Sequence, residues 1–190
     1  MGRWEPDARE RLVRAALDLF DEQGYDNTTV AQIADRAGLT KSTFFRYFPD
    51  KREVLSAGQD TLCRLFEEGI AAAPTSATPL EAVAAALEAS AVAFVPARRD
   101  LGRKMQAAIA ASSELRERDA LKRLALATAI ADALKNRGVP ETSASLAAEL
   151  GILALKRAQT YWSAPTNKRT FSELARQSLD ELRAASAGLR

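Results

Sequence analysis

The chain of 190 residues contains no histidine, a single cysteine and few aromatic residues. The absence of histidine excludes the Ser-His-Asp and Cys-His nucleophile arrangements, and it leaves no imidazole to bind zinc or to transfer protons near neutral pH. With Cys63 alone, the sequence supports neither a disulfide framework nor a site built from several thiolate ligands. We therefore expect no catalytic residues, no metal site and no cofactor.

Long apolar segments are missing as well. The longest apolar-looking stretch, residues 82–95, is too short to cross a bilayer and contains Glu88. The first residues lack the apolar stretch of a secretory signal. These features predict a cytoplasmic protein without a membrane partner, and an apolar content of 47% is sufficient for a folded core.

Positive and negative charges nearly balance over the whole chain, and the net charge at pH 7 is only +2. Residues 1–55 hold nine basic and ten acidic residues, whereas residues 36–52 hold five basic residues and one acidic residue. The basic residues of that short segment are Arg36, Lys41, Arg46, Lys51 and Arg52. Positive charge gathered over so few positions favours contact with phosphate groups at one edge of the fold.

What the chain does contain, almost throughout, is the periodicity of amphipathic helices. No alternating apolar run bounded by turn signals indicates a strand. The sequence predicts an all-α fold of about nine helices, divided into domains at residues 1–50 and 51–190. The first domain would hold three helices; Gly24 can close the first in the left-handed conformation, and Gly38 ends the second.

A capping-box spacing, in which Thr precedes Glu or Gln by three residues, marks the start of several helices. The pairs are Thr29–Gln32, Thr78–Glu81 and Thr170–Glu173. Asp50 with Glu53 makes a similar pattern, and one long fourth helix is expected from there to about Ala72. The fifth helix is expected to end near Pro96.

Residues 29–55 place two short helical patterns around a glycine-centred turn, with Pro49 as the stop. This is the arrangement of a helix-turn-helix, whose second helix enters the DNA major groove. Phe44 and Phe48, four residues apart, are expected to anchor that helix on the two before it. The candidate DNA contacts are Thr29, Thr40, Lys41, Ser42, Thr43, Phe45, Arg46, Tyr47 and Lys51.

These candidates suit DNA in different ways. Lys41 and Arg46 can donate to guanine O6 and N7 or to phosphate, and hydroxyl groups can contact either. Thr29 lies at a helix N-terminus, where free N–H groups attract phosphate, and Lys51 opens the next helix beside the same groove. The alternative is a helical interaction module with a solvated basic face and no specific affinity for DNA.

The spacing closely resembles that of the TetR family of bacterial transcriptional regulators over about the first third of the chain. The matching positions are Ala16, Leu19, Phe20, Gly24, Thr29, Ile33, Ala34, Ala37, Gly38, Ser42, Thr43, Phe44, Phe48 and Lys51. The family usually has tyrosine where this chain has Phe45, so a hydroxyl contact to phosphate is missing there. Tyr47 is the residue that could replace part of it.

The resemblance implies a homodimer that binds a pseudo-palindromic operator in double-stranded DNA and responds to a small-molecule effector. Repression is the usual outcome in the family, and the sequence does not decide between repressor and activator. Residues 51–190 would bind the effector and form the dimer. The last two helices are the expected dimer interface, with packing inside one chain as the alternative.

An effector cavity among the middle helices is also an implication of the resemblance. The candidate lining residues are Cys63, Phe66, Phe94, Met105, Ile109, Gln159 and Trp162. Each residue taken alone is more typical of an ordinary core. Cys63 is interpreted as a packed thiol, with a redox sensor as the alternative.

Two further interpretations concern charged residues. The run Arg98, Arg99, Arg103 and Lys104 is interpreted as a solvated face, with a site for an anionic ligand such as acyl-CoA as the alternative. Glu114, Glu117 and Asp119 alternate with arginines, as in a salt-bridged helix, and form no catalytic arrangement. An enzyme is therefore not expected.

Overall fold

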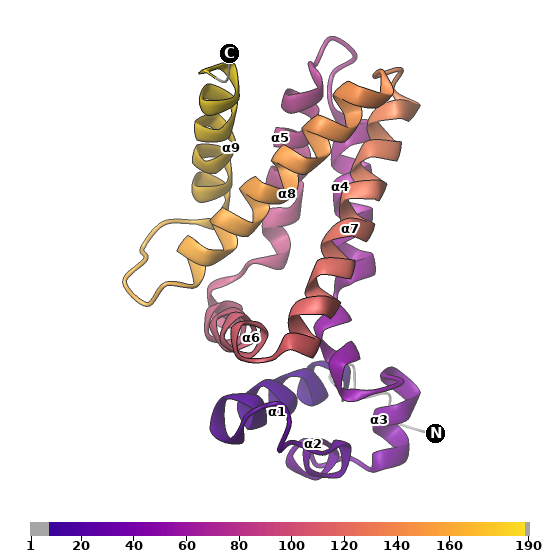
Figure 1. Cartoon of the computed structure of the whole chain (residues 1–190), viewed down its shortest axis with the longest axis vertical. Coiled ribbons are helices and arrows are strands. Elements are labelled where there is room, and N and C mark those ends of the chain that lie inside the picture. Colours follow the sequence, from indigo (N-terminus) through magenta and orange to yellow (C-terminus); the bar gives the residue numbers. More distant parts are fainter. Residues whose placement is uncertain (1–7, 189–190) are drawn as a thin grey trace. The chain divides into compact units, whose positions relative to one another are not determined.

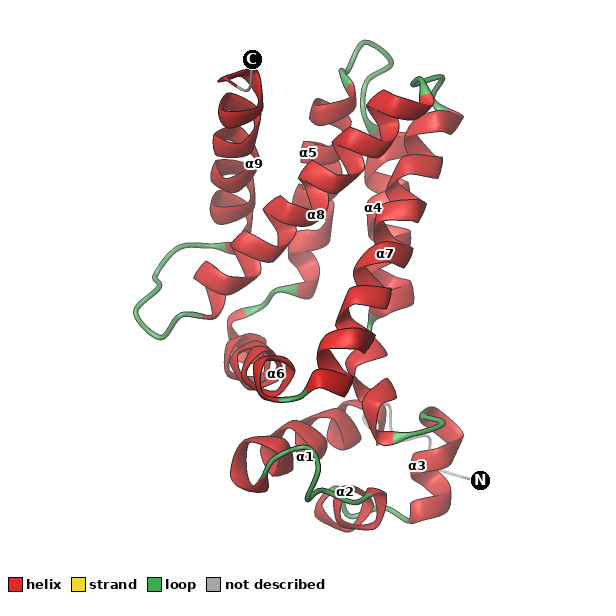
Figure 2. Ribbon diagram, in the orientation of Figure 1, coloured by secondary structure: helices red, strands yellow, loops and turns green. Residues whose placement is uncertain are grey.

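The computed structural model describes residues 8–188, and within that range the chain forms nine α-helices and three short 3-10 helices with no strand (Figure 1). Helical ribbons joined by short loops make up the whole of the described chain (Figure 2). The predicted all-α fold with about nine helices is confirmed. Residues 1–7 and 189–190 are outside this description.

The chain divides into two compact units. The first unit contains the residues up to Ala57 together with Asp100–Leu121, and the second contains Gly58–Arg99 together with the residues from Lys122 onward. The first unit is thus larger than the N-terminal domain expected from the sequence, because residues 51–57 and 100–121 pack with it. The domain division at residue 50 stays a prediction.

The first unit is built from short helices around one apolar cluster. Its elements are α1 (Ala8–Gln23), α2 (Val30–Arg36), α3 (Lys41–Tyr47), the 3-10 helix η1 (Lys51–Ser56), most of α6 (Arg99–Ala111) and the start of α7 (Ser113–Asn136). The fully buried large side chains of the cluster are Leu12, Leu17, Ile33, Phe44, Phe48, Leu55 and Leu115. Residues from α6 and α7 therefore complete the core beneath the helix-turn-helix.

Two turns of this unit require glycine, as the sequence predicts. Gly24 ends α1 with φ 83° and Gly38 ends α2 with φ 65°, both in the left-handed region. A Cβ atom placed on Gly38 would lie 2.9 Å from a terminal nitrogen of Arg11, whose guanidinium donates to the Ala37 carbonyl. The turn between α2 and α3 is consequently fixed by backbone conformation and by a side chain of α1.

The expected continuous fourth helix is wrong. Asp50 caps the short η1, accepting from the N–H groups of Arg52 at 2.9 Å and Glu53 at 3.1 Å, and Gly58 then adopts φ 84°. Because a residue in that conformation cannot continue a right-handed helix, α4 begins afresh at Gln59 and runs to Ala72.

The fifth helix also ends earlier than expected, at Ser90 instead of near Pro96. The Ser90 hydroxyl donates to the Leu87 carbonyl at 2.7 Å, and such a bond competes with continued helix. Two 3-10 turns, Ala91–Ala93 (η2) and Pro96–Arg98 (η3), follow because proline lacks the N–H that a helix interior requires.

The second unit consists of longer helices packed through small residues. Its elements are α4 (Gln59–Ala72), α5 (Pro79–Ser90), the turns η2 and η3, the rest of α7, α8 (Glu141–Ser163) and α9 (Phe171–Gly188). Helix α4 packs on α5, α8 packs on α9, and α5 contacts both α8 and α9 (Figure 1). The capping boxes at Thr78 and Thr170 are present as predicted.

Glycines allow close approach between helices of the second unit. A Cβ atom on Gly69 of α4 would lie 2.6 Å from the Ala86 Cα of α5, and one on Gly151 of α8 would lie 2.7 Å from a Val83 methyl carbon of α5. At Gly69 the two backbones meet with no side chain between them, whereas at Gly151 the Val83 side chain packs directly against the backbone of α8.

No single helix in residues 8–188 has the length and apolar content needed to cross a membrane. The segments 79–93 and 96–111 meet those criteria only when taken together as a bent pair.

Candidate nucleic-acid interface

Helix α3 is anchored on one face by two buried aromatic rings. Phe44 is fully buried and Phe48 is 2% exposed, with ring centroids 5.5 Å apart. The Arg9 guanidinium of α1 lies 5.6 Å from the Phe48 ring centroid. The predicted anchoring role of both phenylalanines is confirmed, and it fixes which face of α3 is left for solvent.

The exposed face of α3 presents most of the candidate contacts. Lys41, Ser42, Phe45, Arg46 and Tyr47 are all exposed. The Lys41 ammonium lies 5.8 Å from the centroid of the Phe45 ring, and the Arg46 guanidinium lies 5.4 Å from that of Tyr47. Neither cation forms an ion pair with a carboxylate of residues 8–188, so both charges face solvent.

The three threonines among the candidates are engaged in helix caps. The Thr40 hydroxyl accepts from the Thr43 N–H at 3.1 Å, and the two hydroxyl oxygens are 2.9 Å apart. The Thr29 N–H donates to Gln32 Oε1 at 2.8 Å, and the Thr29 hydroxyl accepts from the Gln32 N–H at 3.3 Å. Contact with DNA by these groups would share or replace bonds that already hold α2 and α3, and it stays a prediction.

Lys51 has a supporting position that the sequence did not reveal. Its ammonium donates to the carbonyls of Tyr25 at 2.7 Å and Thr28 at 3.0 Å, and it lies 4.0 Å from the Tyr25 ring centroid. Two of its three donors are therefore used to hold the loop between α1 and α2. The expected phosphate contact by Lys51 stays a prediction, with at most one donor left for it.

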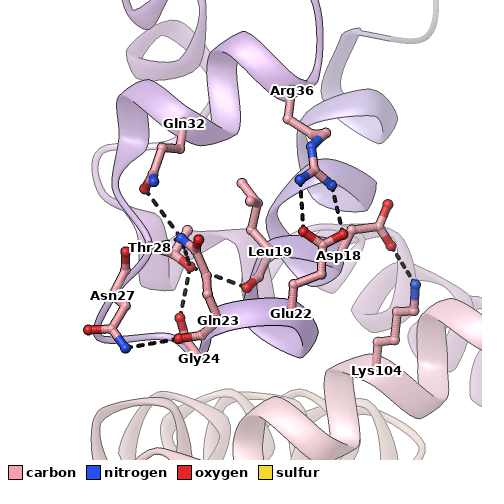
Figure 3. A network of polar contacts seen from close by, with 10 residues as sticks. All are labelled: Asp18, Leu19, Glu22, Gln23, Gly24, Asn27, Thr28, Gln32, Arg36 and Lys104. Atoms are coloured by element: carbon pink, nitrogen blue, oxygen red, sulfur yellow. Dashed lines mark hydrogen bonds and ion pairs between the residues drawn. The ribbon is translucent and has the colours of Figure 1, made fainter.

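The remaining cations of residues 36–52 are paired with carboxylates. Arg36 makes two bonds to Glu22, at 2.9 and 2.8 Å, and the pKa of Glu22 is lowered mainly by this contact (Figure 3). Arg52 bonds Asp50 at 3.0 Å. Of the five basic residues in this segment, only Lys41 and Arg46 have neither a carboxylate nor a backbone carbonyl as a partner within residues 8–188.

A polar network ties α1 to both α2 and α6 within the first unit (Figure 3). Lys104 of α6 bonds Asp18 of α1 at 2.6 Å, a contact that raises the pKa of Lys104. One turn further along α1, Glu22 holds Arg36 of α2. Two successive turns on one face of α1 are thus bonded to α6 and to α2.

A second set of ties joins the start of α7 to the same unit. The Tyr25 hydroxyl donates to Glu114 at 2.8 Å, and burial together with this bond raises the pKa of Tyr25. Arg118 bonds Glu53 and the Ser56 hydroxyl of η1, each at 2.7 Å. The sequence assigned Glu114 and Arg118 to a solvated helix, and its spacing gave no signal of partners more than 60 residues away.

Residues 12–57 match the profile of the bacterial regulatory proteins of the tetR family. The transcriptional regulator TcmR of Streptomyces glaucescens is 38% identical over 81 residues, which are 43% of this chain and 36% of that protein. BetI of Stenotrophomonas maltophilia is 40% identical over 67 residues, which are 35% of this chain and 34% of BetI. The match thus spans about a third of the length of these curated relatives.

A solved structure extends the similarity over nearly the whole chain. FadR of Thermus thermophilus, a TetR-family transcriptional repressor in complex with lauroyl-CoA, is 28% identical with a TM-score of 0.56, and the alignment covers 92% of this chain and 93% of FadR. The predicted resemblance to the TetR family is confirmed by these matches. A regulator from Syntrophomonas wolfei shares the fold at 19% identity, with a TM-score of 0.65.

The residues proposed to line an effector cavity are divided between the two units. Met105 and Ile109 lie in the first unit, partly buried against its core, whereas Cys63, Phe66, Phe94, Gln159 and Trp162 lie in the second. Their joint role in one cavity stays a prediction.

The aromatic candidates of the second unit pack against one another. The Phe94 ring stacks on Phe171 at a centroid distance of 3.8 Å and meets Trp162 edge-on at 5.6 Å. A hollow of about 240 Å³ in this unit is lined by different residues: Ala84, Ala85, Leu87, Glu88, Ala175 and Arg176.

The cationic run and the lone thiol have partners inside the protein. Arg103 bonds Asp100 at 2.8 Å, and Arg99 donates to the Asn167 carbonyl at 2.8 Å while lying 5.4 Å from the Trp162 ring. Cys63 accepts a bond from Gln59 at 3.5 Å, and burial raises the pKa of its thiol. These contacts favour structural roles for both features.

Proposed function

We propose that this protein is a ligand-responsive transcriptional regulator that binds a pseudo-palindromic DNA operator as a homodimer. It acts as a repressor, is released from DNA by a small-molecule effector, and has no enzymatic activity. One observation carries the proposal: Phe44 and Phe48 hold α3 so that Lys41 and Arg46 face solvent, with no carboxylate partner among residues 8–188. Unpaired cations on an exposed helix of a helix-turn-helix suit DNA phosphates and guanine edges.

The proposal predicts a defined dependence on salt. Each phosphate that a cation neutralises lowers the slope of log K against log salt by about 0.9. Lys41 and Arg46 in both subunits of a dimer would account for a slope of up to about 3.6. A double variant, Lys41→Ala with Arg46→Ala, should therefore bind more weakly and depend less steeply on salt.

Fluorescence anisotropy with a labelled duplex, selected from a random pool by the wild-type protein, tests this expectation. The matched control is Arg64→Ala with Arg176→Ala, which removes the same charge from exposed positions of the second unit. If the α3 variant and the control bind with equal affinity and equal salt slope, the DNA-binding function is wrong. A helical interaction module then becomes the better description.

The dimer interface that we propose is a stripe of exposed apolar residues on α8. Leu146, Leu153 and Tyr161 are 60%, 43% and 49% exposed, and with the partly exposed Leu150 they recur at intervals of three, four and eight residues on one face. Such a continuous apolar face is typical of an interaction site. On α9, by contrast, Phe171 and Leu174 are buried inside the chain's own core. The proposed interface therefore depends more on α8 than on α9.

Analytical ultracentrifugation at micromolar concentration tests the dimer. Leu146→Asp with Leu153→Asp should shift the protein toward monomer, because a charge would then replace apolar contact at two positions of the stripe. Leu124→Asp is the control, since Leu124 is 62% exposed but lies on α7. A wild-type monomer, or equal dissociation of both variants, would contradict the α8 interface.

An effector can release DNA only if it binds the form with low DNA affinity more tightly than the form with high affinity. A coupling free energy of about 1–3 kcal/mol would weaken operator affinity some 5–150-fold. Because FadR of Thermus thermophilus was solved with lauroyl-CoA, acyl-CoA thioesters are the first effectors to add to the anisotropy assay. A regulator of chromosomal DNA acts in the bacterial cytoplasm, and that location is part of the proposal.

A further inference from the structure

Phe45 is the one phenylalanine of this chain whose side chain is exposed to solvent. The chain has seven phenylalanines, all within the described residues, and the other six are buried or partly buried. Phe45 is 48% exposed on the solvent face of α3. An exposed aromatic ring contributes little to the stability of its own fold, so the Phe45 ring is available for contact with a partner outside the chain.

Neighbouring side chains hold the Phe45 ring in place. The ring meets the buried Phe44 edge-on, with centroids 5.7 Å apart and planes at 87°. The Lys41 ammonium, one helical turn earlier, lies 5.8 Å from its centroid. Contacts of this kind stabilise an aromatic ring in one orientation. The ring therefore projects from α3 as an apolar surface supported by Phe44 and Lys41.

The chemistry of the ring limits what it can contact in DNA. It has no polar atom with which to bond a phosphate oxygen or the donor and acceptor groups of a base edge. In the major groove, the C5 methyl group of thymine is the apolar group displayed by the base pairs. A short helix placed in that groove by a helix-turn-helix brings its exposed ring toward base edges.

We propose that Phe45 contacts the C5 methyl group of a thymine in each operator half-site, and so determines specificity for thymine at one fixed position. The proposal rests on the proposed function, because it requires α3 to lie in the major groove. It adds a base preference that follows from this chain's own residue. Lys41 and Arg46, exposed on the same helix, would bond acceptors on neighbouring bases or phosphates.

Deoxyuridine gives a direct test, since it differs from thymidine only by the missing methyl group. The probe is the duplex selected from a random pool by the wild-type protein, with each thymine replaced in turn by deoxyuridine. Burial of one methyl-sized group corresponds to roughly a fourfold change in affinity. We expect that loss at one position of each half-site, about fifteenfold when both half-sites are replaced, and little change elsewhere.

Variants then assign the effect to Phe45. Phe45→Ala should bind the thymidine and deoxyuridine duplexes equally, because the contacting ring is gone. Phe45→Leu keeps an apolar side chain and should retain part of the preference. The matched control is Arg46→Ala, because Arg46 lies over the Tyr47 ring and not over Phe45; it should weaken binding to both duplexes and leave their ratio unchanged.

The outcomes separate this proposal from the function on which it rests. If the wild-type protein binds a selected duplex and no deoxyuridine replacement weakens binding, the proposed contact is wrong while the DNA-binding function stands. A preference for thymidine that persists in Phe45→Ala would also overturn the contact. If selection enriches no duplex, both proposals fail. The wild-type measurement requires no variant, so a folding defect in Phe45→Ala cannot obscure the result.

Discussion

Each of the two units of this protein is stabilised internally by a different kind of contact. In the first unit, α2 and α3 have seven residues each and surround large aromatic and leucine side chains. In the second unit, α8 has 23 residues and α9 has 18, and their contacts are rich in alanine and glycine. Helices of seven residues are too short to be stable alone in water, so the first unit depends on its anchors.

The anchors of the first unit include charged and polar contacts as well as apolar ones. Three contacts bond α6 and α7 to α1, to η1 and to the loop after α1. They are Lys104 with Asp18, Arg118 with Glu53, and Glu114 with Tyr25. In the second unit, alanines such as Ala82, Ala86 and Ala147 let helices approach closely along their length. A unit built on a few large anchors should lose much stability when one is removed. One built on close backbone contact should instead be sensitive to added volume.

Phe44→Ala should have the largest effect, because it removes a fully buried ring from the first unit. We expect a loss of about 3–5 kcal/mol in the free energy of unfolding of that unit. Hydrogen exchange on the full chain should show lost protection in α1, α2 and α3, with amides of α5 and α8 little changed. DNA binding should be lost as well.

Phe45→Ala is the control for this prediction, since it removes the same ring one position later at a site that is 48% exposed. Its effect on stability should stay within about 0.5 kcal/mol, as is usual for surface positions. Equal loss of protection in both units after Phe44→Ala would mean that the units unfold together, and the comparison would then fail.

Gly69→Ala tests the second unit with an added methyl group. The new Cβ would lie 2.6 Å from the Ala86 Cα, and a backbone atom cannot move aside as a flexible side chain can. Alanine favours a helix over glycine by up to about 1 kcal/mol, but overpacking of this kind costs about 1–3 kcal/mol. We therefore expect a net loss of stability in urea unfolding, with hydrogen exchange increased in α4 and α5.

Gly188→Ala supplies the control, because a Cβ atom there would meet nothing within 4 Å. It should leave the unfolding midpoint almost unchanged. A stabilised Gly69→Ala protein would show that α4 and α5 can separate without loss. Close backbone contact would then not explain how the second unit holds together.

The same contrast explains how much of the structure could be predicted from the sequence. Local signals were sufficient where a feature depends on neighbouring residues: Gly24 and Gly38 end their helices, Thr78 forms its capping box, and Phe44 is buried four residues from Phe48. All of these features involve residues within one or two helical turns of each other, and spacing in the sequence can predict contacts over that distance.

Features that depend on distant residues were not predictable. Lys51 was assigned to phosphate from its place beside the groove, whereas its bonds go to carbonyls 26 and 23 residues away. Glu114 lies 89 residues from its partner Tyr25. The break at Gly58 was missed because a glycine can occur inside a helix, and only its backbone conformation shows that the helix ends there.

The smallest effect that we predict is a pH dependence of the free energy of unfolding. It arises from a polar contact of the first unit. The pKa of Tyr25 is raised from its ordinary value of 10.0, first by burial and then by its bond to Glu114. The folded state therefore holds the protonated phenol, and its contribution to stability is fully present below pH 10. As the pH rises above 10, the unfolded chain loses this proton first, so the free energy of unfolding should fall.

Tyr25→Phe should lack that dependence, because it has no group to titrate at this position. It should be less stable than wild type at pH 8 through loss of the bond to Glu114, a loss of about 1 kcal/mol. The difference between the two proteins should then shrink between pH 10 and pH 11.5 in urea unfolding followed by circular dichroism. Subtracting the two curves removes contributions from lysines and other groups that titrate in both proteins. Parallel curves would mean that the phenol does not stabilise the first unit through its proton, and that this unit depends on its aromatic anchors more than on its polar ties.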